Sequence, residues 1–234
     1  MKKDHIVCLY EQSGLSALPW ALNGYKVFCY DIQHKERIVT YYPGGGSIQN
    51  IPWDARNKAE NTAMVKRHAG ETKLVLAYPP CTDLAVSGAR HFAAKKEANP
   101  NYREEAMALV YVARSIAECL KAPYAIENPV SVISSEWRKP DHTFSPNNFG
   151  GYLPEADKHP LYPDIFPPQD AYLKKTCLWT GGGYIHPKPK NVKPIGGQVL
   201  FNKLGGKSQR TKNIRSTSPR GFAQAVYEAN KDSQ

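Results

Sequence analysis

One cysteine and one glutamate of this chain stand where they could carry out covalent catalysis. Cys81 follows two prolines after the apolar run 74–77, and Glu127 follows a second apolar run at 124–126. Each run has the composition of a short buried strand. A cysteine nucleophile needs a neighbouring acid or base, and a carboxyl group at the end of an adjacent strand would supply one. The pair therefore predicts a reactive site at the carboxyl edge of a parallel sheet, where open α/β sheets bind their ligands.

Strands and helices alternate along the part of the chain that would hold these residues. Apolar runs predict strands at residues 5–9, 26–30, 73–77 and 124–126, and apolar residues near 3.6-residue spacing predict a helix at 103–120. Such alternation is typical of an α/β fold with a doubly wound, mostly parallel sheet. The length of 234 residues suits one domain, alone or with a small appendage.

Weaker patterns complete the expected architecture. They predict a strand near 48–51, a polar helix at 55–69, a mobile loop at 83–92, a strand at 173–179 and a closing helix from the N-cap Ser218 to Ala229. Seven prolines between residues 137 and 172 indicate a long ordered loop region. The stretch 186–215 shows little regular pattern.

The first strand, turn, helix and second strand look like half of a nucleotide-binding unit. Gly14 lies in the turn, and Asp31 ends the second strand 17 residues later. This spacing is near the ~20 residues that separate a glycine-rich loop from an acid that binds ribose hydroxyls. The glycine pattern is thin, because only Gly14 stands where two glycines would be expected.

The net charge of +10 is concentrated near the end of the chain. Residues 171–227 contain eleven Lys and Arg residues and no Asp or Glu, whereas the charges of residues 1–170 balance. A solvated surface can account for a modest basic excess. A stretch of this length without a carboxylate points instead to a polyanionic partner.

The remaining composition excludes several classes of protein. The five cysteines are widely spaced without a C-x-x-C pair, so we expect neither disulfides nor a metal site. All except Cys81 fall within or beside apolar segments, as small buried residues do. No apolar run approaches the ~20 residues of a membrane helix, and the first run is too short for a signal peptide. We expect an intracellular protein that is located in the cytoplasm of a bacterial host cell or associated with its nucleoid, and we expect it to be a monomer.

Motifs in a fixed order resemble the cytosine-5 DNA methyltransferase family, particularly its compact bacteriophage members. The resemblance extends from about residue 6 to 226 and rests on five motifs: the cofactor loop 9–14 with Asp31 after it, Pro79-Pro80-Cys81, Glu127-Asn128-Pro129, the basic strand 174–179, and the segment 215–220. It implies a Rossmann-like fold that uses S-adenosylmethionine to methylate cytosine in double-stranded DNA. The site residues that it implies fall into three groups. The catalytic residues are Cys81, Glu127, Asn128 and Pro80; the cofactor-binding residues are Tyr10, Glu11, Ser13, Gly14, Leu15, Asp31, Asn50 and Pro79; the DNA contacts are Ser87, Arg90, Lys175, Thr176 and Arg215.

The resemblance also implies a mechanism. Carbon 5 of cytosine is a poor nucleophile, so Cys81 would add at C6 and make the ring enamine-like. Glu127, kept partly protonated by burial, would protonate N3, and Asn128 would hold Glu127. Extruding the target base costs a few kcal/mol, and residues 87–92 would form the lid over the extruded base.

Several positions depart from the family pattern. Gln12 replaces the first loop glycine, and the family's third-strand acid, which is directed toward adenine, has no clear equivalent, so Gln49 or Asn50 would take its place. In the segment 174–179, lysines and Thr176 replace the usual residues of the family's Gln-x-Arg-x-Arg strand. We expect a catalytic domain at 1–180, including the Pro-rich region 138–171, a reduced basic recognition segment at 181–214, and a C-terminal helix at 215–234. So short a recognition segment predicts a target of a few base pairs.

Two alternatives stay open from the sequence. The same fold could act on RNA or a modified cytosine, or could transfer a different one-carbon group. The departures at Gln12 and the third strand would also fit a catalytically inactive nucleic-acid-binding module, although both Cys81 and Glu127 are present.

Overall fold

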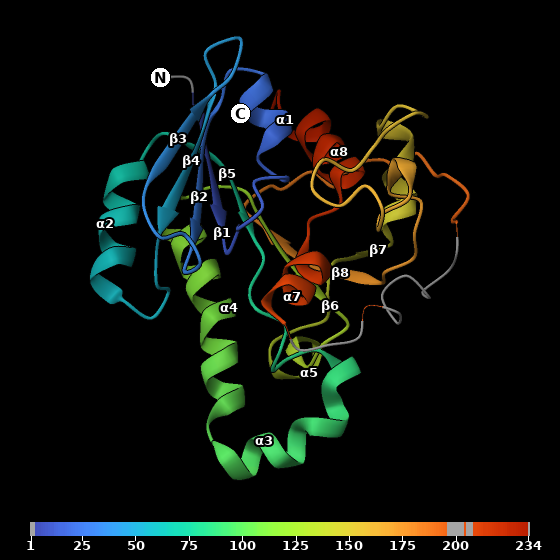
Figure 1. Cartoon of the computed structure of the whole chain (residues 1–234). Coiled ribbons are helices and arrows are strands. Elements are labelled where there is room, and N and C mark those ends of the chain that lie inside the picture. Colours follow the sequence, from blue (N-terminus) through green and yellow to red (C-terminus); the bar gives the residue numbers. More distant parts are fainter. Residues whose placement is uncertain (1–2, 196–203, 205–207, 234) are drawn as a thin grey trace.

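The computed structural model describes residues 3–195, 204 and 208–233, and its centre is one eight-stranded sheet (Figure 1). The strand order is β3-β4-β2-β1-β5-β6-β8-β7. The strand bounds are β1 His5–Leu9, β2 Lys26–Asp31, β3 Ile38–Tyr41, β4 Ser47–Pro52, β5 Thr72–Ala77, β6 Tyr124–Pro129, β7 His142–Phe144 and β8 Thr176–Gly181.

The five central strands β4, β2, β1, β5 and β6 run parallel. β8 lies antiparallel between β6 and β7, and β3 pairs antiparallel with β4 at the other edge. The chain therefore winds outward from β1 in both directions, first through β2 and β4 and then through β5 and β6. This order confirms the predicted doubly wound, mostly parallel sheet. It also creates a switch point between β1 and β5, where such sheets place their ligands.

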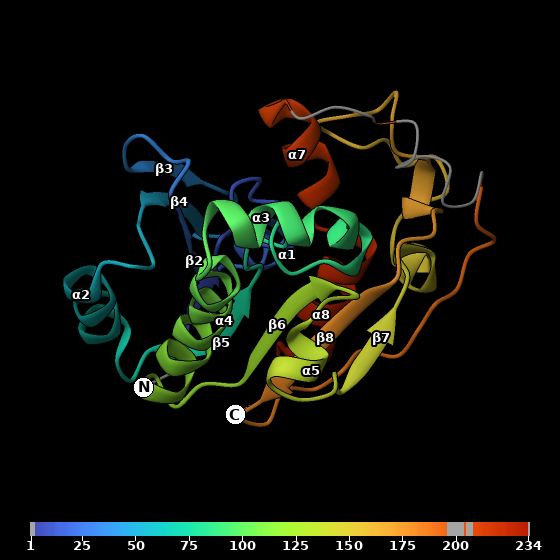
Figure 2. The ribbon, with the colours of Figure 1, turned by 90° about the horizontal axis from the view of Figure 1, so that it is seen from below.

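Helices cover both faces of the sheet (Figure 2). The α-helices are α1 Leu18–Leu22, α2 Lys58–His68, α3 Phe92–Ala98, α4 Tyr102–Cys119, α5 Ile133–Glu136, α7 Gln209–Ser216 and α8 Arg220–Asn230; the 3₁₀ helices are η1 Val86–His91, η2 Pro146–Tyr152 and η3 Pro168–Asp170. Among the described residues no helix has the length and apolar character that crossing a membrane requires.

Two apolar cores follow from the alternation of side chains along β1. Val7 and Leu9 join α2 and α4 in one core, while Ile6 and Cys8 join α1 and α8 in the other. Every residue of β1 is buried, and so is every residue of β5. Strands buried on both faces read as continuous apolar runs, which is why these two were recognisable in the sequence.

The structure differs from the sequence predictions at several elements. The edge strand β3 was missed because three of its four residues are exposed and show no alternation. The stretch 83–92, predicted to be a mobile loop, forms η1 and leads directly into α3. The irregular stretch 186–215 contains α7. Cys119 was expected to be buried and is exposed, because it ends α4 on the outer side.

The closing helix begins later than predicted. Its N-cap is Pro219, and Ser218 makes no capping bond to it. The Ser218 hydroxyl instead donates to the Glu11 carboxylate over 3.4 Å. The Ser218 hydroxyl, which the sequence predicts as the cap of this helix, therefore binds the buried Glu11 in the turn after β1 instead.

The residues that follow β8 pack on the Pro-rich region. Lys190 donates its amide to the Asn148 carbonyl over 2.9 Å, and Gly151 donates back to the Lys190 carbonyl over 2.9 Å. Val192 donates to the Asn147 carbonyl over 2.9 Å. The beginning of the predicted recognition segment thus runs along η2. Its residues 196–203 and 205–207 lie outside the described part.

Candidate active site

The thiol of Cys81 and the carboxyl of Glu127 come from neighbouring parallel strands. Ala77 of β5 pairs with Ile126 of β6, so both side chains emerge at the same edge of the sheet. The segments that follow them are also joined. Val86 donates its amide to the Val130 carbonyl over 3.0 Å, within a local antiparallel bridge. The sequence prediction that the two groups share one edge is consistent with this register.

Asn128 fastens the two strand ends to each other. Its side-chain amide donates to the carbonyl of Pro79 over 2.8 Å, and the residue is 1% exposed. Pro80, next in the chain, is exposed. The Asn128 Oδ1 and Glu127 Oε1 atoms are buried without a hydrogen-bond partner. Buried polar atoms are rarely left unpaired, so two such oxygens at one site indicate a place for a polar ligand.

Burial dominates the protonation of both reactive groups. It raises the pKa of the Glu127 carboxyl, and nearby Lys174 opposes this effect. Burial likewise raises the pKa of the Cys81 thiol, while the positive charges of Lys174 and Arg215 lower it. A carboxyl with a raised pKa can donate a proton near neutral pH. The thiol depends on the two cations for its ionisation.

Lys174 is the residue at this site that sequence reasoning missed. It acts electrostatically on both reactive groups, and its ammonium donates to the Arg215 carbonyl over 3.0 Å. Lys175 is exposed, and its charge acts on Cys177. Thr176 is fully buried, and its hydroxyl donates to the Lys174 carbonyl over 3.0 Å. Of the three consecutive residues, Lys174 is the one that the structure brings to the thiol and carboxyl.

The turn after β1 is organised around the buried side chain of Glu11. One carboxylate oxygen accepts the amides of Ser13 and Gly14, each over 2.9 Å, and the Ser13 hydroxyl over 2.7 Å. The other oxygen accepts the hydroxyls of Ser16 and Ser218. Gly14 has φ +72°, a conformation that glycine adopts without strain. Leu15 is buried in this turn.

Tyr10, Asp31 and Asp54 lie at the ends of β1, β2 and β4, respectively. Tyr10 has φ +60°, donates its hydroxyl to the Leu109 carbonyl over 2.8 Å and packs on Trp53 at a ring distance of 5.0 Å. Burial raises its pKa, and the charges of Asp54 and Asp31 raise it further, so both carboxylates lie near its hydroxyl. Asp31 is 6% exposed and accepts the amide of Gln33 over 2.7 Å.

Asp54 is a second residue that the sequence reasoning missed. It lies two residues beyond β4 and is only partly exposed. The sequence predicts Gln49 or Asn50, both inside β4, in place of the third-strand acid. Gln49 is bound to Arg37 at 2.5 Å, whereas Asn50 keeps a buried Oδ1 without a partner. The available signal was that functional side chains follow parallel strands rather than lie within them.

The predicted DNA-contact residues Ser87 and Arg90 lie in η1 and are exposed. The helix that follows is tied to the thiol loop, because Lys95 donates to the Thr82 carbonyl and to Asp83, each over 2.7 Å. Arg215, on α7, is exposed as well. Of these three predicted contact residues, Arg215 acts electrostatically on the Cys81 thiol.

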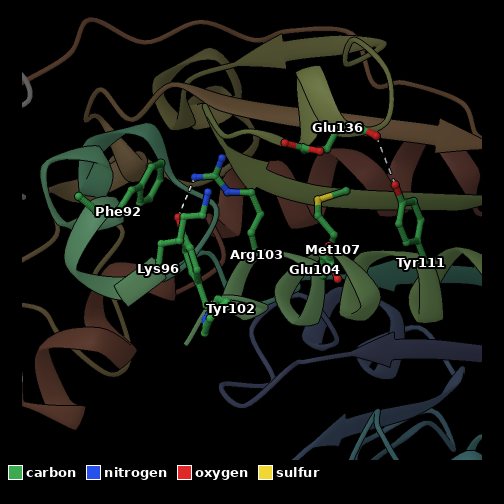
Figure 3. Close-up of a pocket in the computed structure, with 10 residues that line it drawn as sticks. Phe92, Lys96, Tyr102, Arg103, Glu104, Met107, Tyr111 and Glu136 are labelled. Carbon is green, nitrogen blue, oxygen red and sulfur yellow. Dashed lines mark hydrogen bonds between the residues drawn. The ribbon is translucent and has the colours of Figure 1, made fainter. Parts of the chain in front are cut away.

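A cavity of about 710 Å³ lies between α3, α4 and α5 (Figure 3). The guanidinium of Arg103 lies over the ring of Phe92 at 4.6 Å and donates to the Tyr102 hydroxyl over 2.9 Å. Neither Cys81 nor Glu127 lines this cavity. The cavity is therefore separate from the reactive pair.

One group in the described part of the chain could hold a metal ion. It consists of Asp4, His5 and Glu71, whose ligand atoms lie within 4.8 Å of one another. Asp4 also pairs with Lys26 at 3.0 Å. The group lies at the amino ends of β1 and β5, which is the edge of the sheet opposite to Cys81.

Comparison with known proteins adds little to this geometry. No family model and no curated protein matches the chain. Among solved structures, the chain is similar to a candidate DNA modification methyltransferase encoded within an Escherichia coli prophage, with a TM-score of 0.47 and 11% identity. The match covers 88% of this chain and 55% of the other. The fold class follows from the strand order itself, and the match assigns no role to any residue.

Proposed function

We propose that this protein is a cytosine-5 DNA methyltransferase that uses S-adenosylmethionine. The observation that carries the proposal is the placement of Cys81 and Glu127 at one sheet edge, with Lys174 acting on both. A thiol, a proton donor and a cation are the groups that covalent activation of a pyrimidine ring requires. Their order in the chain is also that of the family motifs.

Each residue has a role in the proposed reaction. The Cys81 thiolate forms a bond to C6 of cytosine while Glu127 donates a proton to N3, so that C5 becomes nucleophilic. Asn128 holds the Pro79 turn against the strand that bears Glu127. After transfer, a base removes the C5 proton, the sulfur–C6 bond breaks, and the N3 proton returns to Glu127. Lys174 favours the thiolate before the attack and provides a donor for the ring carbonyl.

The residues at the ends of β1, β2 and β4 fit the methyl donor. S-adenosylmethionine supplies an electrophilic methyl group on a positively charged sulfur. Asp31 would bind the ribose hydroxyls, as acids in this position do. Ile32, which follows it, is 62% exposed and offers an apolar surface for adenine. Asp54, which pairs with Arg56 at 2.8 Å, would take the place of the third-strand acid, and the unpartnered Oδ1 of Asn50 within β4 would be a further acceptor.

The basic part of the chain would hold double-stranded DNA. α7 has no acidic residue and ends at the site, where the Arg215 carbonyl accepts from Lys174. Together with Arg90 and Ser87 of η1 it would contact phosphates on both sides of an extruded base. We retain the division into a catalytic part (1–180), a recognition segment (181–214) and a C-terminal helix (215–234) as part of the proposal, with a short target sequence.

Trapping of a covalent complex tests the proposal. DNA containing 5-fluorocytosine blocks loss of the C5 substituent, so the wild-type protein should form a denaturation-resistant complex in the presence of S-adenosylmethionine. Cys81→Ala should form none. Cys119→Ala is a matched control, since Cys119 is exposed and remote in the chain from the motif. A Cys81→Ala protein that still forms the complex, or a wild-type protein that traps 5-fluorocytosine RNA and not DNA, would contradict the proposal.

A further inference from the structure

Glu11 occupies the backbone amides that a ligand anion would take in a glycine-rich loop. Successive amides at such a turn form a concave site for phosphate or carboxylate groups. Here the amides of Ser13 and Gly14 donate to the Glu11 carboxylate, each over 2.9 Å. Glu11 is 2% exposed, and the chain's own carboxylate thus fills the site. The loop has no free amide pair at these positions for the anionic group of a nucleotide.

The charge of Glu11 is held by hydrogen bonds and not by a cation. Both of its oxygens accept from amides or hydroxyls, which is how an ionised carboxylate bonds. In the described part of the chain, no Lys or Arg forms an ion pair with it within 4.0 Å. Its negative charge therefore extends into its surroundings.

Other carboxylates share the space around this loop. Burial is the main cause of the raised pKa of Asp31, and the hydrogen bond from the Gln33 amide opposes it. The negative charge of Glu11 raises this pKa further. Asp54 and Asp31 both act on Tyr10, which precedes Glu11. Asp54 pairs with Arg56 at 2.8 Å, but neither Glu11 nor Asp31 has an ion-pair partner in the part of the chain that the structure describes, so these two carboxylates make the ends of β1 and β2 locally acidic. Such an environment favours a positively charged ligand over a neutral one.

We propose that Glu11 is a specificity-determining residue that makes the crevice prefer the positively charged methyl donor to its neutral product. The inference rests on the proposed function, because it takes the ligand to be S-adenosylmethionine. Methyl transfer converts the sulfonium to a thioether, with the methyl group leaving for C5 of the base. The attraction exerted by Glu11 is then lost, so product release is favoured by the reaction itself. In this role Glu11 acts through its charge, in addition to holding the loop.

Replacement of the carboxylate by an amide separates charge from structure. In Glu11→Gln the side-chain oxygen can still accept from Ser13 and Gly14, but the negative charge is gone. Glu11→Asp keeps the charge and shortens the reach, so it disturbs the loop without neutralising it. Glu118→Gln is a control, since Glu118 lies in an exposed pair with Arg114 on α4.

Calorimetric titration of each protein with S-adenosylmethionine and with S-adenosylhomocysteine measures the preference directly. We expect the ratio of the two dissociation constants to fall about tenfold in Glu11→Gln, through weaker binding of the sulfonium, because a buried charge acts in a medium of low dielectric constant. Glu11→Asp and Glu118→Gln should retain the wild-type ratio. An unchanged ratio in Glu11→Gln would show that the residue is only structural and would overturn the inference.

A second probe requires no mutant and covers the case in which Glu11→Gln does not fold. Sinefungin replaces the methylated sulfur by a carbon that bears a protonated amine, so it is cationic where S-adenosylhomocysteine is neutral. The wild-type protein should bind sinefungin more tightly than S-adenosylhomocysteine, and equal or weaker binding would contradict the inference. A wild-type protein that binds none of the three compounds would instead refute the proposed function.

Discussion

Arg220 offers a quantitative test of how the start of α8 is held. Its guanidinium bonds the two oxygens of Asp157 at 2.7 and 2.5 Å and reaches Asp170 at 3.1 Å. The Asp170 carboxylate also accepts the amide of Gly221 over 3.0 Å. The side chains of Arg220, Asp157 and Asp170 are only 10%, 11% and 1% exposed. The group joins the Pro-rich region to the final helix.

Arg220→Met would leave two buried carboxylates without their cation. Removing one partner of a buried ion pair costs about 3–5 kcal/mol. For a domain of this size, each kcal/mol lowers the melting temperature by about 2–4 °C, so the loss should be roughly 6–20 °C. Arg114→Met is the control, because the Arg114 and Glu118 side chains are 41% and 50% exposed and such pairs contribute about 0.3–0.5 kcal/mol.

Urea denaturation at neutral pH measures both variants. Adding Asp157→Asn and Asp170→Asn to Arg220→Met should restore part of the lost stability, since the unpaired charges are then removed. A cost of Arg220→Met below about 1 kcal/mol, equal to that of the exposed control, would refute the reasoning. So would a triple variant less stable than Arg220→Met alone.

The contribution of the ion pair between Arg220 and Asp157 to stability has a defined pH dependence. Burial raises the pKa of Asp157, but its hydrogen bonds with Arg220 outweigh this effect and hold the pKa below the usual range. A carboxyl with a lowered folded-state pKa stabilises the protein above its unfolded pKa of ~3.9 and loses that contribution as the pH falls through the folded value. Burial raises the pKa of Asp170, so the contribution of this carboxyl to the free energy of unfolding changes with pH in the opposite direction. The cost of Arg220→Met should shrink in acid as Asp157 becomes protonated in the variant.

Three further predictions concern the reactive pair and its substrate. Lys174→Met should move the alkaline-rising limb of the kcat/KM profile to higher pH, because Lys174 lowers the pKa of the Cys81 thiol. Asn128→Ala should reduce kcat by roughly 10²-fold with a small change in KM for the cofactor, since the hydrogen bond to the Pro79 carbonyl that aligns the two strand ends is lost. Single-turnover kinetics measure this loss, and an equal change in kcat and KM would contradict the prediction. Arg215→Ala should lower the slope of log affinity for DNA against log salt by about 1, as expected for one lost phosphate contact, and an unchanged slope would place Arg215 away from the DNA.

The positions of Cys81 and Glu127 were predictable because the strands before them are buried on both faces. Their apolar runs are continuous, and strand order in an α/β fold is constrained. The end of each apolar run then predicts the position of the reactive residue that comes after it. The fold class and the sharing of one sheet edge therefore required no knowledge of side-chain contacts.

The choice between Lys174 and Lys175 depends on contacts that no local pattern reveals. β8 begins at Thr176, so both lysines precede the strand and its alternation does not orient them. Lys174 is directed by a bond to the Arg215 carbonyl, 41 residues away in the sequence. Ser218 is a similar case, because its acceptor Glu11 lies 207 residues away. Long-range hydrogen bonds decide such positions, and a single sequence does not contain them in readable form.

The proposed substrates impose opposite electrostatic demands on one small site. DNA requires positive charge, which Lys174 brings from the segment before β8 and Arg215 from α7. A sulfonium requires negative charge, which Glu11 and Asp31 bring from the ends of β1 and β2. Charges of both groups act on Glu127. Its pKa is raised first by burial, then lowered by Lys174 and raised by Glu11. The protonation of the proposed general acid therefore depends on both binding regions: loss of the Lys174 charge would raise the pKa of Glu127, and loss of the Glu11 charge would lower it.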